Sequence, residues 1–196
     1  MENFSALIVF AFTMACTPGP NNVIATASGV NYGYMRTIPF IMGLTIGFPV
    51  MIAMVGFGLG FIFDAYPWLH TVMKVLGIAY LLWLAYKLAT ASSIGSNTDD
   101  KPLTFLQAAG FQWINPKSWA AGTSTLTTFT SSEAGNFHWQ VVVVASVYIA
   151  AGFVSGSIWT LIGAGISRFL KNPKTLRVFN LSMAALLIGS LVMLFL

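Results

Sequence analysis

The chain has 196 residues, of which 57% are apolar and only 7% are charged, and its formal net charge is +4. About a quarter of the residues of a soluble domain are charged, so this composition excludes an ordinary water-soluble fold and predicts a membrane protein. The Lys and Arg residues are spread along the chain beside apolar runs and form no basic patch, which argues against nucleic acid as a partner.

Six apolar segments follow one another along the chain, and each is long enough to cross a hydrocarbon core of about 30 Å as a helix. They cover residues 4–27, 38–63, 68–89, 104–129, 140–166 and 176–196. Residues 93–103, between the third and fourth segments, are polar and are interpreted as a linker. We therefore expect an all-α membrane protein with six transmembrane helices in one domain over residues 1–196.

The first apolar segment is interrupted by the run Thr17-Pro18-Gly19-Pro20-Asn21-Asn22, and the fourth by Asn115-Pro116-Lys117. A proline inside a helix removes one backbone hydrogen bond and clashes with the preceding turn. Backbone groups freed in this way cost several kcal/mol each in hydrocarbon, so they persist only where protein, water or substrate satisfies them. Both interruptions fall in the first helix of their half of the chain, which predicts two broken helices in corresponding positions.

The two halves also share other features. The second segment of each half carries closely spaced glycines that let helix backbones approach in lipid, namely Gly43, Gly47, Gly56 and Gly60, then Gly152 and Gly156. Because three crossings per half is an odd number, the second half enters the membrane from the opposite side. We expect two inverted three-helix repeats with broken first helices, at about 1–92 and about 104–196.

The basic residues predict the orientation. The loops after the first, third and fifth segments hold Arg36, Lys87, Lys101, Arg168, Lys171, Lys174 and Arg177, whereas Lys74 is the one basic residue near the opposite ends. Cytoplasmic loops carry the excess of Lys and Arg. Both termini are therefore expected to face the periplasm.

A small zwitterion suits the two interruptions. Its carboxylate can meet amide N–H groups at a half-helix N-terminus, and its ammonium can meet freed carbonyls and Asn side chains. The competing interpretation is a pair of packing kinks whose broken ends are capped by Asn. The candidate substrate-binding residues are Pro18, Gly19, Pro20, Asn21, Asn22, Gln112, Asn115, Pro116 and Lys117.

Lys117 lies deep in the fourth segment, where a charge costs at least about 2.5–3.5 kcal/mol. The apolar spans offer no acidic residue to pair with it. One hypothesis is that Lys117 faces a central cavity, where it attracts a substrate carboxylate or changes protonation during transport. The other is that it caps carbonyls freed by Pro116.

Other functional classes fit less well. Cys16 is the only cysteine, which argues against a membrane electron carrier and a multi-thiolate metal site. An intramembrane enzyme needs acids or histidines gathered at one depth, whereas His70 and His138 lie at outer helix ends in different halves. No cofactor and no metal are expected. A passive channel and an uptake carrier stay open, as does a homodimer, because the glycine spacings suit packing within one chain or between two.

The motifs resemble those of the LysE/RhtB family of bacterial amino-acid exporters. The resemblance rests on residues 17–22 and on Phe111-Gln112-Trp113-Ile114-Asn115-Pro116-Lys117-Ser118, with further similarity at 43–47 and 77–84. It implies secondary-active efflux of a small neutral amino acid across the inner membrane by alternating access, commonly driven by the proton motive force. Some homoserine- or threonine-specific relatives carry an acid in the fifth helix, but residues 152–159 have none. The chain is in that respect more similar to the cysteine and O-acetylserine exporter branch.

Overall fold

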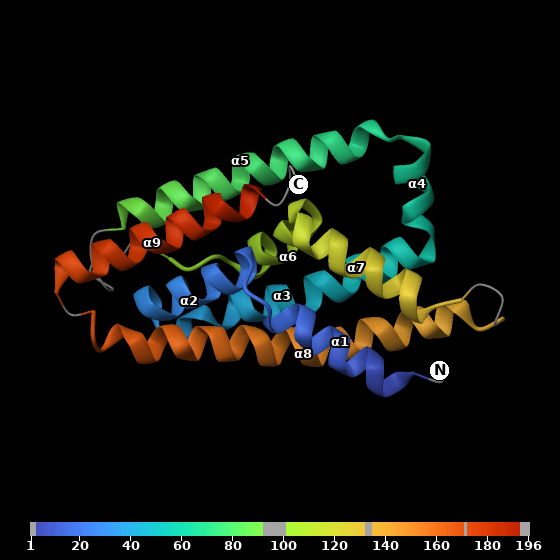
Figure 1. Ribbon diagram of the computed structural model, residues 1–196, viewed down its shortest axis with the longest axis horizontal. Coiled ribbons are helices and arrows are strands. Elements are labelled where there is room, and N and C mark those ends of the chain that lie inside the picture. Colours follow the sequence, from blue (N-terminus) through green and yellow to red (C-terminus); the bar gives the residue numbers. More distant parts are fainter. Residues whose placement is uncertain (1–2, 92–100, 132–134, 171, 193–196) are drawn as a thin grey trace.

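The computed structural model describes residues 3–91, 101–131, 135–170 and 172–192, and its regular elements over those ranges are helices (Figure 1). In chain order they are α1 (Phe4–Cys16), α2 (Pro20–Tyr32), α3 (Tyr34–Met54), the π-helical turn η1 (Val55–Leu59), α4 (Gly60–Ala65), α5 (Trp68–Thr90), α6 (Phe105–Ile114), α7 (Pro116–Phe129), α8 (Phe137–Ser167) and α9 (Pro173–Val192). Most of the predicted linker at 93–103 lies outside the described residues.

Four of the predicted crossings have helices of suitable length and apolarity. They are the continuous stretch Tyr34–Ala65, α5, α8, and the pair α1–α2, which bends by 57° at its break. The predicted fourth segment is divided into helices of 10 and 14 residues, each short for a crossing on its own. The described part of α9 carries two basic residues near its start. Six crossings therefore remain a prediction.

The second apolar segment, expected over 38–63, lies inside the continuous stretch Tyr34–Ala65, which extends a few residues beyond it at each end. The helix begins at Tyr34, directly after Gly33, and its regular part ends at Met54. The π-helical turn that follows contains Gly58 at φ 123°, a conformation that side-chain-bearing residues rarely adopt. The chain then turns through α4 into α5, so Gly58 makes the corner between the two long helices (Figure 1).

α8 is the central element of the bundle and packs against α1, α2 and α3. Its contact with α2 brings two backbones together: a Cβ at Gly29 would lie 2.1 Å from the carbonyl oxygen of Thr160, and a Cβ at Gly163 would lie 2.1 Å from that of Thr26. Without side chains at these two glycines the helices meet at van der Waals distance. Small residues provide such close approach between helices in lipid.

α3 makes a similar contact with α6. A Cβ at Gly43 would lie 2.4 Å from the carbonyl oxygen of Phe105, and one at Gly47 would lie 2.5 Å from the Cα of Ala109. Gly152 faces α3 at an ordinary distance, and a Cβ at Gly156 would lie 3.3 Å from Cγ2 of Ile41, which is a tight contact. The sequence thus identified two of the closest helix contacts through Gly43 and Gly47, but it did not single out Gly29 or Gly163.

Most of the described basic residues lie toward one end of the bundle, whereas Lys117 lies at the second break and Lys74 lies near the start of α5. Lys87 lies in the last turn of α5, Arg168 follows α8, and α9 begins with Lys174 and Arg177 in its first two turns. These helix ends lie together at the left of Figure 1. Asp64 lies in α4 at the opposite end. α1 also begins at that opposite end, so the chain starts far from the basic end.

Two large apolar clusters fill most of the interior, and a smaller one joins Val30, Leu170 and Leu176. One of the large clusters joins residues of α2, α3, α5, α6 and α9, and includes Phe40, Leu44 and Phe111. The other joins α1, α3, α7 and α8, and includes Leu7 and Tyr148. A cavity lies between them, because Leu44 from the first cluster and Tyr148 from the second both line it.

Candidate functional site

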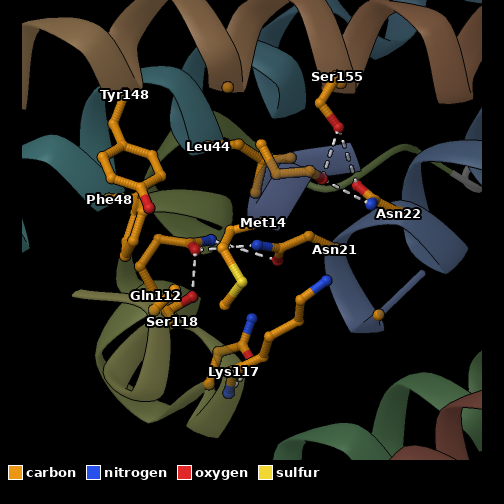
Figure 2. A pocket seen from close by; sticks show the side chains of 16 residues that line it. Met14, Asn21, Asn22, Leu44, Phe48, Gln112, Lys117, Ser118, Tyr148 and Ser155 are labelled. Atoms are coloured by element: carbon orange, nitrogen blue, oxygen red, sulfur yellow. Dashed lines mark hydrogen bonds between the residues drawn. The ribbon is translucent and has the colours of Figure 1, made fainter. Parts of the chain in front are cut away.

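The two helix breaks meet at that cavity, which has a volume of about 70 Å³ (Figure 2). One ordered water needs about 10–15 Å³ by a comparable measure, so the space suits a small polar molecule. Its walls come from the α1–α2 break, α3, the α6–α7 break and α8. We call it the break cavity, and the residues lining it are Met14, Ala15, Gly19, Asn21, Asn22, Leu44, Phe48, Gln112, Asn115, Lys117, Ser118, Ala121, Tyr148, Gly152, Ser155 and Gly156.

The first break is built by its proline and glycine residues. α1 ends at Cys16, Thr17 is extended, and α2 begins at Pro20, whose missing N–H is harmless at the first position of a helix. Gly19 is the N-cap and no side chain caps α2. The positive end of the α2 dipole therefore lies at the cavity wall.

Side-chain donors satisfy the carbonyl groups that this break frees. The carbonyl oxygen of Ala15 accepts from Asn22 Nδ2 and from Ser155 Oγ, each at 2.8 Å. Asn22 Nδ2 also donates to the carbonyl oxygen of Thr17 at 2.9 Å, and Trp159 Nε1 donates to that of Cys16 at 3.3 Å. Two helices, α2 and α8, thereby supply donors that the broken α1 lacks.

Lys117 completes this set and joins the two breaks. Its ammonium donates to the carbonyl oxygen of Thr17 and, at 3.3 Å, to that of Pro18. The side chain is partly buried and lines the break cavity. It does cap freed carbonyls, but they belong to the first break and not to its own.

The second break satisfies its own backbone locally. Asn115 is 1% exposed, and its Oδ1 accepts from the backbone N–H of Lys117 at 3.1 Å, while Pro116 occupies the first position of α7. Trp119 Nε1 donates to the carbonyl oxygen of Trp113 at 2.6 Å. Protein groups therefore bond several of the backbone carbonyls freed at the two breaks, although no side chain caps the N-terminus of α2. A solute in the break cavity would meet side chains before it meets free backbone carbonyls, which differs from the expectation drawn from the sequence.

A pair of side-chain amides makes a second connection between the breaks (Figure 2). Asn21 Nδ2 donates to Gln112 Oε1 at 3.0 Å, and Gln112 Nε2 donates back to Asn21 Oδ1 at 3.3 Å. Gln112 is 1% exposed, and its Oε1 also accepts from Ser118 Oγ at 2.8 Å. The wall of the cavity thus contains neutral donors and acceptors beside the single ammonium.

The opposite wall is apolar and holds a buried tyrosine. The ring of Tyr148 meets the ring of Phe48 edge-on, with centroids 4.9 Å apart. The Tyr148 hydroxyl and Thr125 Oγ1 form a hydrogen bond of 2.8 Å. Met14 and Leu44 complete this wall, so a bound solute would have one polar and one apolar side.

The predicted site residues divide into two groups. Gly19, Asn21, Asn22, Gln112, Asn115 and Lys117 line the break cavity. Pro20 is buried at the start of α2, Pro18 is exposed, and Pro116 lines a separate hollow of about 160 Å³ between α5 and the α6–α7 break. These three prolines make the breaks without lining the cavity.

Sequence reasoning missed several lining residues, among them Ser118, Tyr148 and Met14. Ser118 lies within the second motif, directly after Lys117, so its position in the motif could have identified it. Tyr148 lies in the middle of a uniformly apolar helix, so no local signal identifies it. In the described parts of the chain, no group of three His, Cys, Asp or Glu side chains is close enough to hold a metal ion.

Comparison with known proteins places this geometry in context. The LysE type translocator family matches residues 12–195. The chain is 30% identical over 194 residues to the cysteine/O-acetylserine efflux protein of Salmonella typhimurium, covering 97% of this chain and 96% of that relative. It is also 30% identical over 195 residues to the protein of the same name from Escherichia coli O139:H28, with the same coverage. No solved structure matches the chain.

Proposed function

This chain belongs to the LysE family of translocators, and from that premise we propose that it exports a small neutral amino acid or a close derivative across the bacterial inner membrane by alternating access. The names of the relatives favour cysteine and O-acetylserine as the first substrates to test. Homoserine and threonine form the second group. The protein acts as a secondary carrier and catalyses no covalent step.

The observation that carries this proposal is the meeting of both breaks at one cavity whose charged lining residue, within the described chain, is Lys117. Lys117 and the uncapped N-terminus of α2 make one wall electropositive. A substrate carboxylate would bind there. The oxygens of Gln112 and Asn21 lie nearby and suit the substrate ammonium.

Lys117 supplies a physical link between binding and movement. In this structure its ammonium is held by carbonyls of the other break. A carboxylate in the cavity competes for the same ammonium and makes a stronger, charge-assisted hydrogen bond. Binding then weakens a connection between α7 and the end of α1, which biases the two halves toward a second arrangement. The proton motive force is the proposed driver of this export.

We further propose that two inverted repeats and six crossings underlie the movement. The pairing of elements is reciprocal: α8 packs against the broken α1–α2, and α3 packs against the broken α6–α7. α3 also pairs with α8, and α5 pairs with α9. With the basic end of the bundle in the cytoplasm, both termini face the periplasm.

The test is transport by the purified protein in proteoliposomes, with cysteine, O-acetylserine, homoserine and threonine compared under pH gradients of either sign. Lys117→Met is expected to abolish transport of the preferred substrate. Lys174→Met, which removes the same charge from the start of α9, is the matched control and keeps wild-type transport. Unchanged transport by Lys117→Met would remove the break cavity from the mechanism. Net movement only toward the face that bears the basic residues would favour the alternative of an uptake carrier.

A further inference from the structure

A second cavity lies toward the basic end of the bundle, between α2, α5, α9 and residues 101–103. Its volume is about 70 Å³, and none of the residues that line it also lines the break cavity. α2 connects the two: Asn22, near its start, lines the break cavity, and Asn31, near its end, lines the second one. Asn22 and Asn31 lie about 13 Å apart along the helix axis, and the second cavity extends from Asn31 back to Ile24, close to the first. We call the second one the basic-end cavity.

The charges at the basic-end cavity are all positive. Lys87 from the last turn of α5 and Lys101, which precedes α6, both line it, and no described lining residue is a carboxylate. Lys87 Nζ also lies 5.6 Å from the centre of the Trp83 ring, which holds the ammonium near the end of α5. Two ammonium groups without a carboxylate favour an anionic ligand.

Asn31 adds a second, independent requirement. The residue is 5% exposed, and its Oδ1 is buried without a hydrogen-bond partner. Its Nδ2 is already engaged, because it donates to the carbonyl oxygen of Ala27 at 2.8 Å and to Asn180 Oδ1 at 3.3 Å. Asn180 Nδ2 in turn donates to the carbonyl oxygen of Ala91 at 3.2 Å, which fixes the orientation of both amides. Asn31 lines the cavity, and its buried Oδ1 thus lacks the donor that buried oxygens normally have.

A ligand that bonds to both lysines and to Asn31 carries an anionic oxygen for the lysines and an N–H donor for Asn31. An α-amino acid has both groups on adjacent atoms. Free phosphate supplies no N–H donor, and the trimethylammonium of a choline headgroup has no N–H either. The remaining wall is apolar, with Ile24, Leu84 and Leu187 among its residues, and accommodates a short side chain.

We propose that the basic-end cavity is a second amino-acid binding site, which receives the exported solute on the cytoplasmic side before it reaches the break cavity. This proposal rests on the proposed export function, because that function identifies the solute and the direction. Binding there raises the local concentration of substrate at one end of α2. The site would be used once in each transport cycle, before the breaks open.

The experiment measures equilibrium binding of radiolabelled L-cysteine, under reducing conditions, to the full-length protein in phosphatidylcholine nanodiscs. Wild type is expected to bind at two sites, and Lys117→Met at one. Adding Lys87→Gln and Lys101→Gln to Lys117→Met is expected to weaken that remaining site about tenfold or more. The matched control adds Lys174→Gln and Arg177→Gln, which removes the same charge at the same end but from residues that line a different hollow.

Asn31→Leu tests the N–H requirement and is expected to weaken the same site. Asn31 is buried, so this change risks misfolding. The lysine variants therefore decide the test, because both lysines are exposed. A single site in wild type that is lost in Lys117→Met and unchanged by the lysine substitutions would overturn this inference and leave the export function standing. Absence of all cysteine binding would count against both. A lysine effect confined to nanodiscs containing phosphatidylethanolamine, whose headgroup carries both a phosphate and an N–H donor, would assign the cavity to a lipid headgroup and overturn the inference as well.

Discussion

Lys117 donates a hydrogen bond to the carbonyl oxygen of Thr17, a residue 100 positions away in the chain. The contact joins the start of α7 to the end of α1, and it brings together the two places where proline interrupts a helix. The Lys117 side chain at the second break therefore satisfies a backbone carbonyl freed at the first break. The following predictions test this arrangement and the packing that supports it.

Gly19→Ala is expected to displace Lys117. A Cβ at Gly19 would lie 2.6 Å from Cδ of Lys117, which is too close for both to stay in place. Transport should fall strongly while folding is retained, because the flexible lysine can move aside. Initial rates in proteoliposomes measure the effect. Gly110→Ala is the control, since a Cβ there meets nothing within 4 Å. Transport by Gly19→Ala at the wild-type rate would show that Lys117 need not stay in its place beside Gly19.

Gln112→Leu is expected to lower the stability of the protein by about 0.6–2 kcal/mol, the range for interhelical hydrogen bonds in membranes. The change removes the partner of Asn21 and of Ser118 inside a closed site. Thermal unfolding in detergent measures the loss. Replacing Asn21 by Leu in the same chain should recover part of it, because two apolar neighbours leave no unpaired amide at that position. A double variant that is less stable than Gln112→Leu would contradict this explanation.

Gly163→Ala is expected to destabilise the bundle by about 1–3 kcal/mol or more. The new methyl would lie 2.1 Å from the carbonyl oxygen of Thr26, and a helix backbone cannot shift locally to make room. Yield and melting temperature provide the measurement. Gly165→Ala, two residues along the same helix and with nothing within 4 Å of its Cβ, should be neutral or slightly stabilising. Equal melting temperatures for the two variants would show that α2 and α8 do not meet as described.

Gly152→Ala is expected to change which substrate is preferred. Gly152 lines the break cavity, and a Cβ there meets only the Cα of Thr45, at 3.5 Å, so folding tolerates the methyl while the cavity becomes smaller. The ratio of kcat/KM for cysteine over the bulkier O-acetylserine should rise about tenfold. Competition between the two substrates in proteoliposomes measures that ratio. An unchanged ratio would mean that substrate side chains do not reach this wall.

Much of the fold follows from local features of the sequence. Pro18, Pro20 and Pro116 lie where helices end, because a proline removes a backbone donor. Proline alone does not end a helix here, since Pro39 and Pro49 lie inside α3. The apolar segments coincide with the helices because backbone groups in lipid must be bonded within the segment. The basic residues at the ends of α5 and α9 follow the same logic, since a charge avoids the hydrocarbon. The corner at Gly58 was missed because a glycine between apolar residues does not reveal a positive φ.

The sequence by itself determined the two breaks, the apolar segments and the position of Lys117 within the second break. Only the tertiary structure decided that the breaks meet, that Lys117 caps the other break, and that Tyr148 and Ser155 share its cavity. The physical reason lies in the solvent. Lipid is as apolar as a leucine side chain, so an apolar pattern does not tell which face of a membrane helix points inward. That choice depends on close backbone contacts such as Gly29 with Thr160 and on hydrogen bonds between distant helices, and both arise only when the whole bundle is assembled.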